Sequence, residues 1–239
     1  LPERLNRVIL APPGGAPKAE AAETAAKEDR VRVERLPNGL RVLLKRHRNL
    51  PLVSMQAYVL GGSLVDDEAT AGRSSLVGQM LDKGTRHMTA SQIAEYFDSI
   101  GGKFSTGAGR NSVYASATVL RDDFSQAFAV FAECFTRPAF PAEEFEKVKQ
   151  LALGAIVRRR DNPQQEAFEA FFDSLPASTP YHLIQGGKTE TVQRLTVEDM
   201  RSYHARYFVP DQMIVAVFGD VEPAQALKLA QQHFGQIKR

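Results

Sequence analysis

The stretch AGRSSLVGQMLDKGT, from Ala71 to Thr85, indicates the fold more strongly than any other part of the chain. Its small and apolar residues predict a buried helix over residues 71–81. Ser75 and Gln79 are one helical turn apart and therefore share a face, and Gly78 directly precedes Gln79. A serine hydroxyl and a glutamine amide are weak metal ligands, and glycine has no side chain to accept a proton. This face therefore offers neither metal ligands nor a general base.

Turn signals and hydrophobic periodicity divide the chain around this helix into groups of strands and helices. The Asn38-Gly39 pair predicts a hairpin between the first two strands. The predicted strands are residues 31–36, 40–46, 52–60, 103–106, 112–120 and 213–218. The other predicted helices are residues 89–100, 122–136, 142–160, 163–175, 197–208 and 223–234. This order predicts an α+β fold, a two-layer sandwich in which a mixed, mostly antiparallel sheet packs against several helices.

An aromatic stripe marks the predicted core. Phe124, Phe128, Phe131 and Phe135 recur at spacings of three and four residues, which places them on one helix face. The single cysteine, Cys134, lies in the same run. We expect a buried thiol, and the chain cannot form an internal disulfide.

Charge and hydropathy exclude several function classes. The 30 basic and 28 acidic residues give a formal net charge of +2, which is no electrostatic footprint for nucleic acid. No apolar run approaches the roughly 20 residues of a membrane helix, so we expect no membrane span. The five histidines, His47, His87, His182, His204 and His233, include no pair at ligand spacing on one helical turn. The sequence therefore contains no local zinc motif.

Composition divides the chain into a leader and a domain. Residues 12–29 are rich in Ala, Pro, Gly, Lys and Glu, so we expect residues 1–29 to be a linker or a mostly disordered leader. Residues 30–239 should form one domain. Because the chain begins with Leu1, we expect it to be a piece of a longer polypeptide with a preceding domain.

Several separated segments resemble the pitrilysin/insulinase-type zinc metallopeptidases, the family that includes proteins like the mitochondrial processing peptidase. The resemblance extends from Arg30 to the end of the chain and depends on the order and spacing of these segments. The segments are LPNGLRV at 36–42, GGS at 61–63, MLDKGT at 80–85, IGGKF at 100–104, RDNP at 160–163, PYH at 180–182, YHARYFVPD at 203–211 and GDV at 219–221. The resemblance implies the fold of one insulinase-type peptidase domain.

The resemblance also identifies four degenerate positions. Active members carry His-x-x-Glu-His in the frame where this chain has Ser75, Gly78 and Gln79. A third ligand, a glutamate, precedes an Asp-Asn-Pro-like turn, and aligning that turn on residues 161–163 places Ala155 at the ligand position. The resemblance therefore implies no catalytic residue, no bound metal and no cofactor in this chain, with zinc only in a catalytic partner domain.

Members of the family resemble clamshells of homologous halves, of which one holds zinc. The resemblance implies that this chain is a non-catalytic half of a zinc metalloendopeptidase, which lines the substrate chamber, helps to bind an extended peptide and pairs with a catalytic domain or subunit. We expect the chain alone to be inactive. The compartment stays open, and the resemblance is compatible with the bacterial periplasm or cell envelope.

Two alternatives remain at this level. One is a stand-alone scaffold for protein–protein contacts. The other is a peptidase with an unusual metal site, which requires His182, His204 or carboxylates to converge in space. For both histidines a structural role is the default, and the acidic loop Asp66-Asp67-Glu68 is expected to be solvated.

Overall fold

A computed structural model describes residues 30–179 and 181–238 of the chain. The linker or leader predicted over residues 1–29 lies outside the described residues. Within the described part, no helix is long and apolar enough to cross a membrane.

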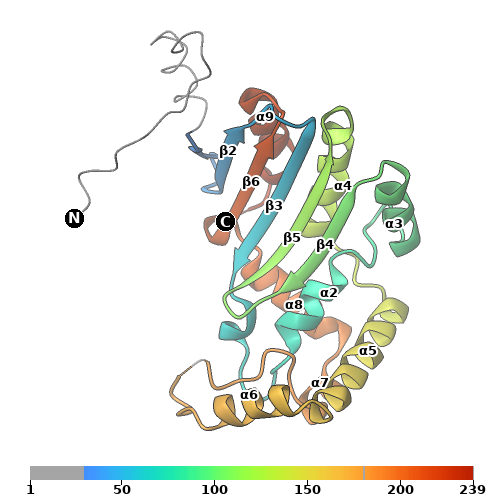
Figure 1. Cartoon of the computed structure of the whole chain (residues 1–239), viewed down its shortest axis with the longest axis vertical. Coiled ribbons are helices and arrows are strands. Elements are labelled where there is room, and N and C mark those ends of the chain that lie inside the picture. Colours follow the sequence, from blue (N-terminus) through green and yellow to red (C-terminus); the bar gives the residue numbers. More distant parts are fainter. Residues whose placement is uncertain (1–29, 180, 239) are drawn as a thin grey trace, which may run out of the picture.

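One mixed sheet of six strands forms the first layer (Figure 1). Its strand order is β1-β2-β6-β3-β5-β4, and only the β2–β6 pair is parallel. The strands are β1 (Arg32–Arg35), β2 (Arg41–Arg46), β3 (Leu52–Leu60), β4 (Lys103–Ala108), β5 (Ser112–Leu120) and β6 (Met213–Gly219). The prediction of a mixed, mostly antiparallel sheet is confirmed.

The helices form a second layer on one side of the sheet and continue beyond its lower end (Figure 1). They are α2 (Arg73–Met80), α3 (Ala90–Ser99), α4 (Phe124–Thr136), α5 (Ala142–Arg160), α6 (Pro163–Asp173), α7 (Thr189–Arg194), α8 (Val197–Tyr207) and α9 (Pro223–Phe234). Short 3₁₀ turns lie at Gly62–Val65, Arg121–Asp123 and Pro210–Gln212. The sequence did not predict α7, because six residues contain too few apolar repeats to show a helical period.

The core lies between the two layers. Val53, Met55, Ala57 and Val59 alternate along β3 and are fully buried, as a strand with one face on the core requires. The aromatic stripe of α4 is also fully buried and faces these strands, which confirms its prediction as core. Cys134 is buried in the same helix, and burial raises the pKa of its thiol to about 12. The thiol is therefore protonated at neutral pH.

The helix predicted from the stretch at 71–85 is α2, and it occupies a central place. It packs against β4 at the edge of the sheet and against α5 and α8. Figure 1 shows α2 in the lower half of the molecule, between the end of the sheet and α5. Residues from three other parts of the chain therefore surround the helix that carries Ser75, Gly78 and Gln79.

Candidate functional site

A buried carboxylate fixes the start of α2. Asp66 Oδ2 accepts hydrogen bonds from the Ser74 backbone N–H at 3.1 Å and from the Ser74 hydroxyl at 2.7 Å. Gly72, at the N-cap, has no side chain to cap the helix, and its φ of +96° lies in the left-handed region. Asp66 therefore satisfies a helix-terminal N–H that the N-cap cannot reach.

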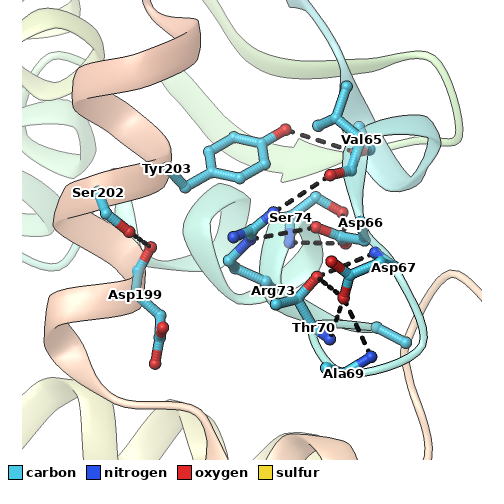
Figure 2. Close-up of polar contacts among 12 residues, drawn as sticks. Val65, Asp66, Asp67, Ala69, Thr70, Arg73, Ser74, Asp199, Ser202 and Tyr203 are labelled. Carbon is cyan, nitrogen blue, oxygen red and sulfur yellow. Dashed lines mark hydrogen bonds and ion pairs between the residues drawn. The ribbon is translucent and has the colours of Figure 1, made fainter.

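Arg73 connects this carboxylate to α8 (Figure 2). Its guanidinium donates to Asp66 Oδ1 at 3.3 Å and to the Val65 carbonyl at 3.1 Å, and it lies 5.3 Å from the centroid of the Tyr203 ring. The Tyr203 hydroxyl donates to the Gly62 carbonyl at 3.5 Å. The start of α2, the preceding loop and α8 are thus held by one polar network.

The network corrects the expectation that the acidic loop is solvated throughout. Asp66 is only 8% exposed, whereas Asp67 and Glu68 lie at the surface. Burial raises the pKa of Asp66, and its hydrogen bonds with Ser74 and the charge of Arg73 oppose that rise. Burial likewise raises the pKa of Tyr203. Sequence reasoning missed this role, although a glycine N-cap is a signal that some other group must cap the helix.

Ser75 and Gln79, the two positions predicted to correspond to histidines in active members, bond to each other. Gln79 Nε2 donates to the Ser75 hydroxyl at 3.2 Å and to the Ser75 carbonyl at 3.3 Å. Both side chains are half-buried on the same face of α2. The Gln79 amide nitrogen and the two Ser75 oxygens are therefore bonded to each other within α2.

The position of the expected general base is closed by the backbone of β4. A Cβ atom placed on Gly78 would lie 2.3 Å from the Gly107 carbonyl carbon and 2.7 Å from the Ala108 nitrogen. Real Cβ atoms do not approach other heavy atoms so closely. A glutamate at position 78 would therefore require α2 and β4 to move apart.

The position of the third ligand carries no donor. Ala155 is exposed on α5, one turn after Leu151, whose side chain is also exposed. These residues do not fit a zinc ion, which takes thiolate, imidazole or carboxylate ligands. Among the described residues, no group of three or more His, Cys, Asp or Glu side chains is arranged to hold a metal ion.

The histidines required by the unusual metal site do not form a site together. His204 is half-buried, stacks on Phe208 with ring centroids 4.0 Å apart, and lies with Nε2 3.0 Å from the Phe135 carbonyl. Burial lowers its pKa to about 4. His182 lies instead in the loop between α6 and α7, with Nδ1 bonded to the Thr179 carbonyl at 2.6 Å.

A groove lies beside β4, the strand at the edge of the sheet. Its volume is about 500 Å³. Phe97 and Phe104 line it with stacked rings whose centroids lie 4.6 Å apart. Ile93 adds apolar surface, and four charged side chains also line the groove: Asp82, Lys83, Asp98 and Lys103. The groove therefore offers apolar and charged contacts beside an edge strand, and sequence reasoning did not predict it.

The mixed sheet is backed by helices, and the side chains of α2 at positions 75, 78 and 79 supply no zinc ligand. This fold is that of a metallopeptidase-like domain. The chain belongs to the insulinase family of peptidases, peptidase family M16, whose model matches residues 41–181. A second model, described as the peptidase M16 inactive domain, matches residues 194–239.

Relatives and solved structures agree with this assignment. An uncharacterized zinc protease from Rickettsia bellii is 27% identical over 205 residues, which cover 86% of this chain and 50% of the relative. A probable mitochondrial-processing peptidase subunit beta from Arabidopsis thaliana is 24% identical over 86% of this chain and 39% of that protein. The crystal structure of a peptidase M16 inactive domain from Pseudomonas fluorescens superposes with a TM-score of 0.82 at 25% identity, covering 87% of this chain and 51% of that one. The chain thus spans half the length of the Rickettsia bellii relative and less than half the length of the Arabidopsis thaliana protein.

Proposed function

We propose that this chain is a non-catalytic half of a two-part zinc peptidase. In this role it lines the substrate chamber, helps to bind an extended peptide and pairs with a homologous half that carries zinc. The observation that carries the proposal is the state of α2, where Ser75 and Gln79 bond to each other and Gly78 lies against the backbone of β4. Zinc peptidases activate water through a metal held by side chains, and these positions supply none.

The pairing with another half is supported by length and by surface. The Rickettsia bellii relative is about twice as long as the matched part, so it has room for a second domain of similar size. On α6, Phe168 and Phe171 lie on one face and are each 56% exposed. Large apolar side chains gathered on a surface are typical of protein interfaces. We infer that this face of α6 contacts the zinc-bearing half.

The peptide-binding role is supported by the groove beside β4. An edge strand presents unpaired N–H and C=O groups, to which an extended peptide can add as another strand. The stacked Phe97 and Phe104 rings would then receive an apolar side chain of the peptide.

The first test is the metal content of the purified chain, by elemental analysis after dialysis, beside zinc calorimetry on the same sample. We expect no stoichiometric zinc and no cleavage of peptides. Tight one-to-one zinc binding would overturn the proposal and favour an unusual metal site.

The pairing is tested with the homologous half. A His-x-x-Glu-His segment encoded in the same gene or in a neighbouring gene would identify that half. We expect the two halves to co-purify, and the double variant F168S/F171S to weaken their association by about tenfold or more, because it removes two exposed aromatic side chains that the interface would bury. The variant V33S, on the exposed strand β1, is the matched control and should leave association unchanged. Equal association of both variants would contradict the α6 interface.

A further inference from the structure

A second cavity, of about 500 Å³, lies between the loop that precedes α2, the end of α6 and the start of α7. Its lining includes the charged or titratable side chains of Glu68, Asp173, His182 and Lys188, with apolar walls from Leu175 and Leu183. It shares no lining residue with the groove beside β4, and none of the four degenerate positions lines it. The cavity is therefore separate from the site described above.

His182 has a fixed orientation in this cavity. Its Nδ1–H donates to the Thr179 carbonyl at 2.6 Å, so the neutral ring presents the lone pair of Nε2. Nε2 is buried and has no hydrogen-bond partner among the described residues. It lies 4.0 Å from Glu68 Oε1, which is too far for a hydrogen bond. Two acceptors thus face each other across a gap.

The spacing of the two acceptors suits a single donor that bonds to both, and because Nε2 is buried the exposed Glu68 side chain must shift outward to admit it. At ordinary hydrogen-bond lengths of about 2.8–2.9 Å to each acceptor, a donor there would subtend roughly 90°, which a small shift of the exposed Glu68 widens toward the tetrahedral angle. A zinc ion fits poorly, because its two bonds sum to about 4.1 Å and atoms 4.0 Å apart would force nearly linear coordination.

The charges of the cavity favour a cation. Lys188 Nζ lies 3.2 Å from Asp173 Oδ1, so these two opposite charges are paired on one wall. Among the described residues, Glu68 has no partner at ion-pair distance other than His182, whose ring carries no charge when it is neutral. The remaining uncompensated charge is negative, and the walls beyond it are apolar.

Contacts across the chain hold the walls in place. Arg110, from the turn between β4 and β5, donates to the Leu183 carbonyl at 3.3 Å and lies 3.7 Å from the centroid of the Phe172 ring. The Thr191 hydroxyl donates to the Ala71 carbonyl at 2.9 Å, which ties α7 to the entry of α2. The cavity is therefore built by several elements and does not belong to a single loop.

We propose that this cavity binds a primary alkylammonium group, with the ammonium nitrogen between His182 Nε2 and Glu68 and the methylene chain along Leu175 and Leu183. The amino terminus of a peptide and a lysine side chain share this chemistry. The inference does not depend on the proposed pairing with a zinc-bearing half, because a small free amine is enough to test it.

The test is a titration of the full chain with n-pentylammonium, followed by ¹⁵N NMR of the histidine rings. We expect a saturable shift of the His182 ring signals in the millimolar range, which corresponds to about −4 kcal/mol of binding free energy. The uncharged analogue 1-pentanol should bind about tenfold more weakly or not at all, because it lacks the charge that Glu68 stabilises.

The variant E68Q should weaken pentylammonium binding by about tenfold while the fold stays intact, since this side chain is 82% exposed. E166Q, on an exposed part of α6 outside the cavity, is the matched control and should bind as the wild type does. Equal binding of pentanol, an unchanged affinity of E68Q, or no shift of His182 would overturn the inference.

The same titration separates the two sources. A lysine-free peptide with a free amino terminus and an N-acetylated peptide with one lysine are compared on the full chain. A shift of His182 with only one of them identifies that source. If neither peptide binds while pentylammonium does, the cavity accepts free amines and the inference stands.

Discussion

Gly78 and Gly107 face each other across the contact between α2 and β4, and the backbones meet there without an intervening side chain. A Cβ on Gly78 would lie 2.6 Å from the Gly107 carbonyl oxygen. Gly78, the position predicted to match the glutamate of active members, is therefore a packing position in this chain. A glutamate here would require α2 and β4 to move apart, so a change of this one residue alone does not introduce a base.

The first prediction concerns this contact. The variant G78A should lower the free energy of unfolding by about 1–3 kcal/mol, because the added methyl overpacks the contact with β4. Urea denaturation measures the difference. The matched control is G154A in the middle of α5, where a Cβ meets only the end of the Arg158 side chain at 3.3 Å. G154A should be stabilising by about 0.5–1 kcal/mol, since alanine favours a helix over glycine. Equal effects of the two variants would contradict the close contact.

A second prediction separates metal binding from packing. The double variant S75H/Q79H should gain measurable zinc binding, because two imidazoles at this spacing share one half-buried helix face. Adding G78E should lower the free energy of unfolding by more than G78A does, since a larger side chain enters the same closed contact. Zinc calorimetry and urea denaturation check the two effects. If S75H/G78E/Q79H is as stable as S75H/Q79H, β4 moves away from α2 at this point without a loss of stability.

The third prediction concerns the polar network at the start of α2. D66A should lower the free energy of unfolding by about 3–5 kcal/mol, because it leaves the half-buried Arg73 guanidinium without its carboxylate and the Ser74 N–H without its acceptor. D67A, one residue further along in an exposed loop, is the control, and its effect should stay within about 1 kcal/mol. Thermal unfolding followed by circular dichroism compares them. Similar losses for both variants would argue against a special role of Asp66.

The fourth prediction is a pH dependence from His204. Burial lowers its folded-state pKa to about 4, whereas the unfolded chain titrates near the ordinary value of 6.5. The unfolded state therefore binds more protons between these values, and the free energy of unfolding falls as pH falls through this window. Between pH 7 and pH 5 the loss should be about 2 kcal/mol.

Urea denaturation at the two pH values measures this loss. In H204L the pH-dependent difference should shrink by that amount, because the titrating ring is gone. The variant H47Q, which replaces an exposed histidine, should keep the wild-type difference. If H204L and the wild type lose the same stability at pH 5, the ring is accessible to protons in the folded state.

The sequence alone predicted the elements and their grouping. The Asn38-Gly39 hairpin, the strand from residue 52 to 60 and the aromatic stripe of α4 all appear where expected. These features are local: turn residues act within a few positions, and the periods of strands and helices are visible in one segment. The lack of metal ligands at Ser75, Gln79 and Ala155 also follows from residue type alone, and its consequence for activity stays a prediction.

Only the tertiary structure decided the features that join distant segments. The burial of Asp66, the closure of Gly78 against Gly107 and the gap between His182 and Glu68 each depend on where other elements pass. The parallel pairing of β2 with β6 likewise brings together strands that are separated by most of the chain. Periodicity shows which face of an element is apolar, but it does not show which backbone approaches that face. That approach is set by the packing of the whole chain, because each contact depends on how two layers fit together.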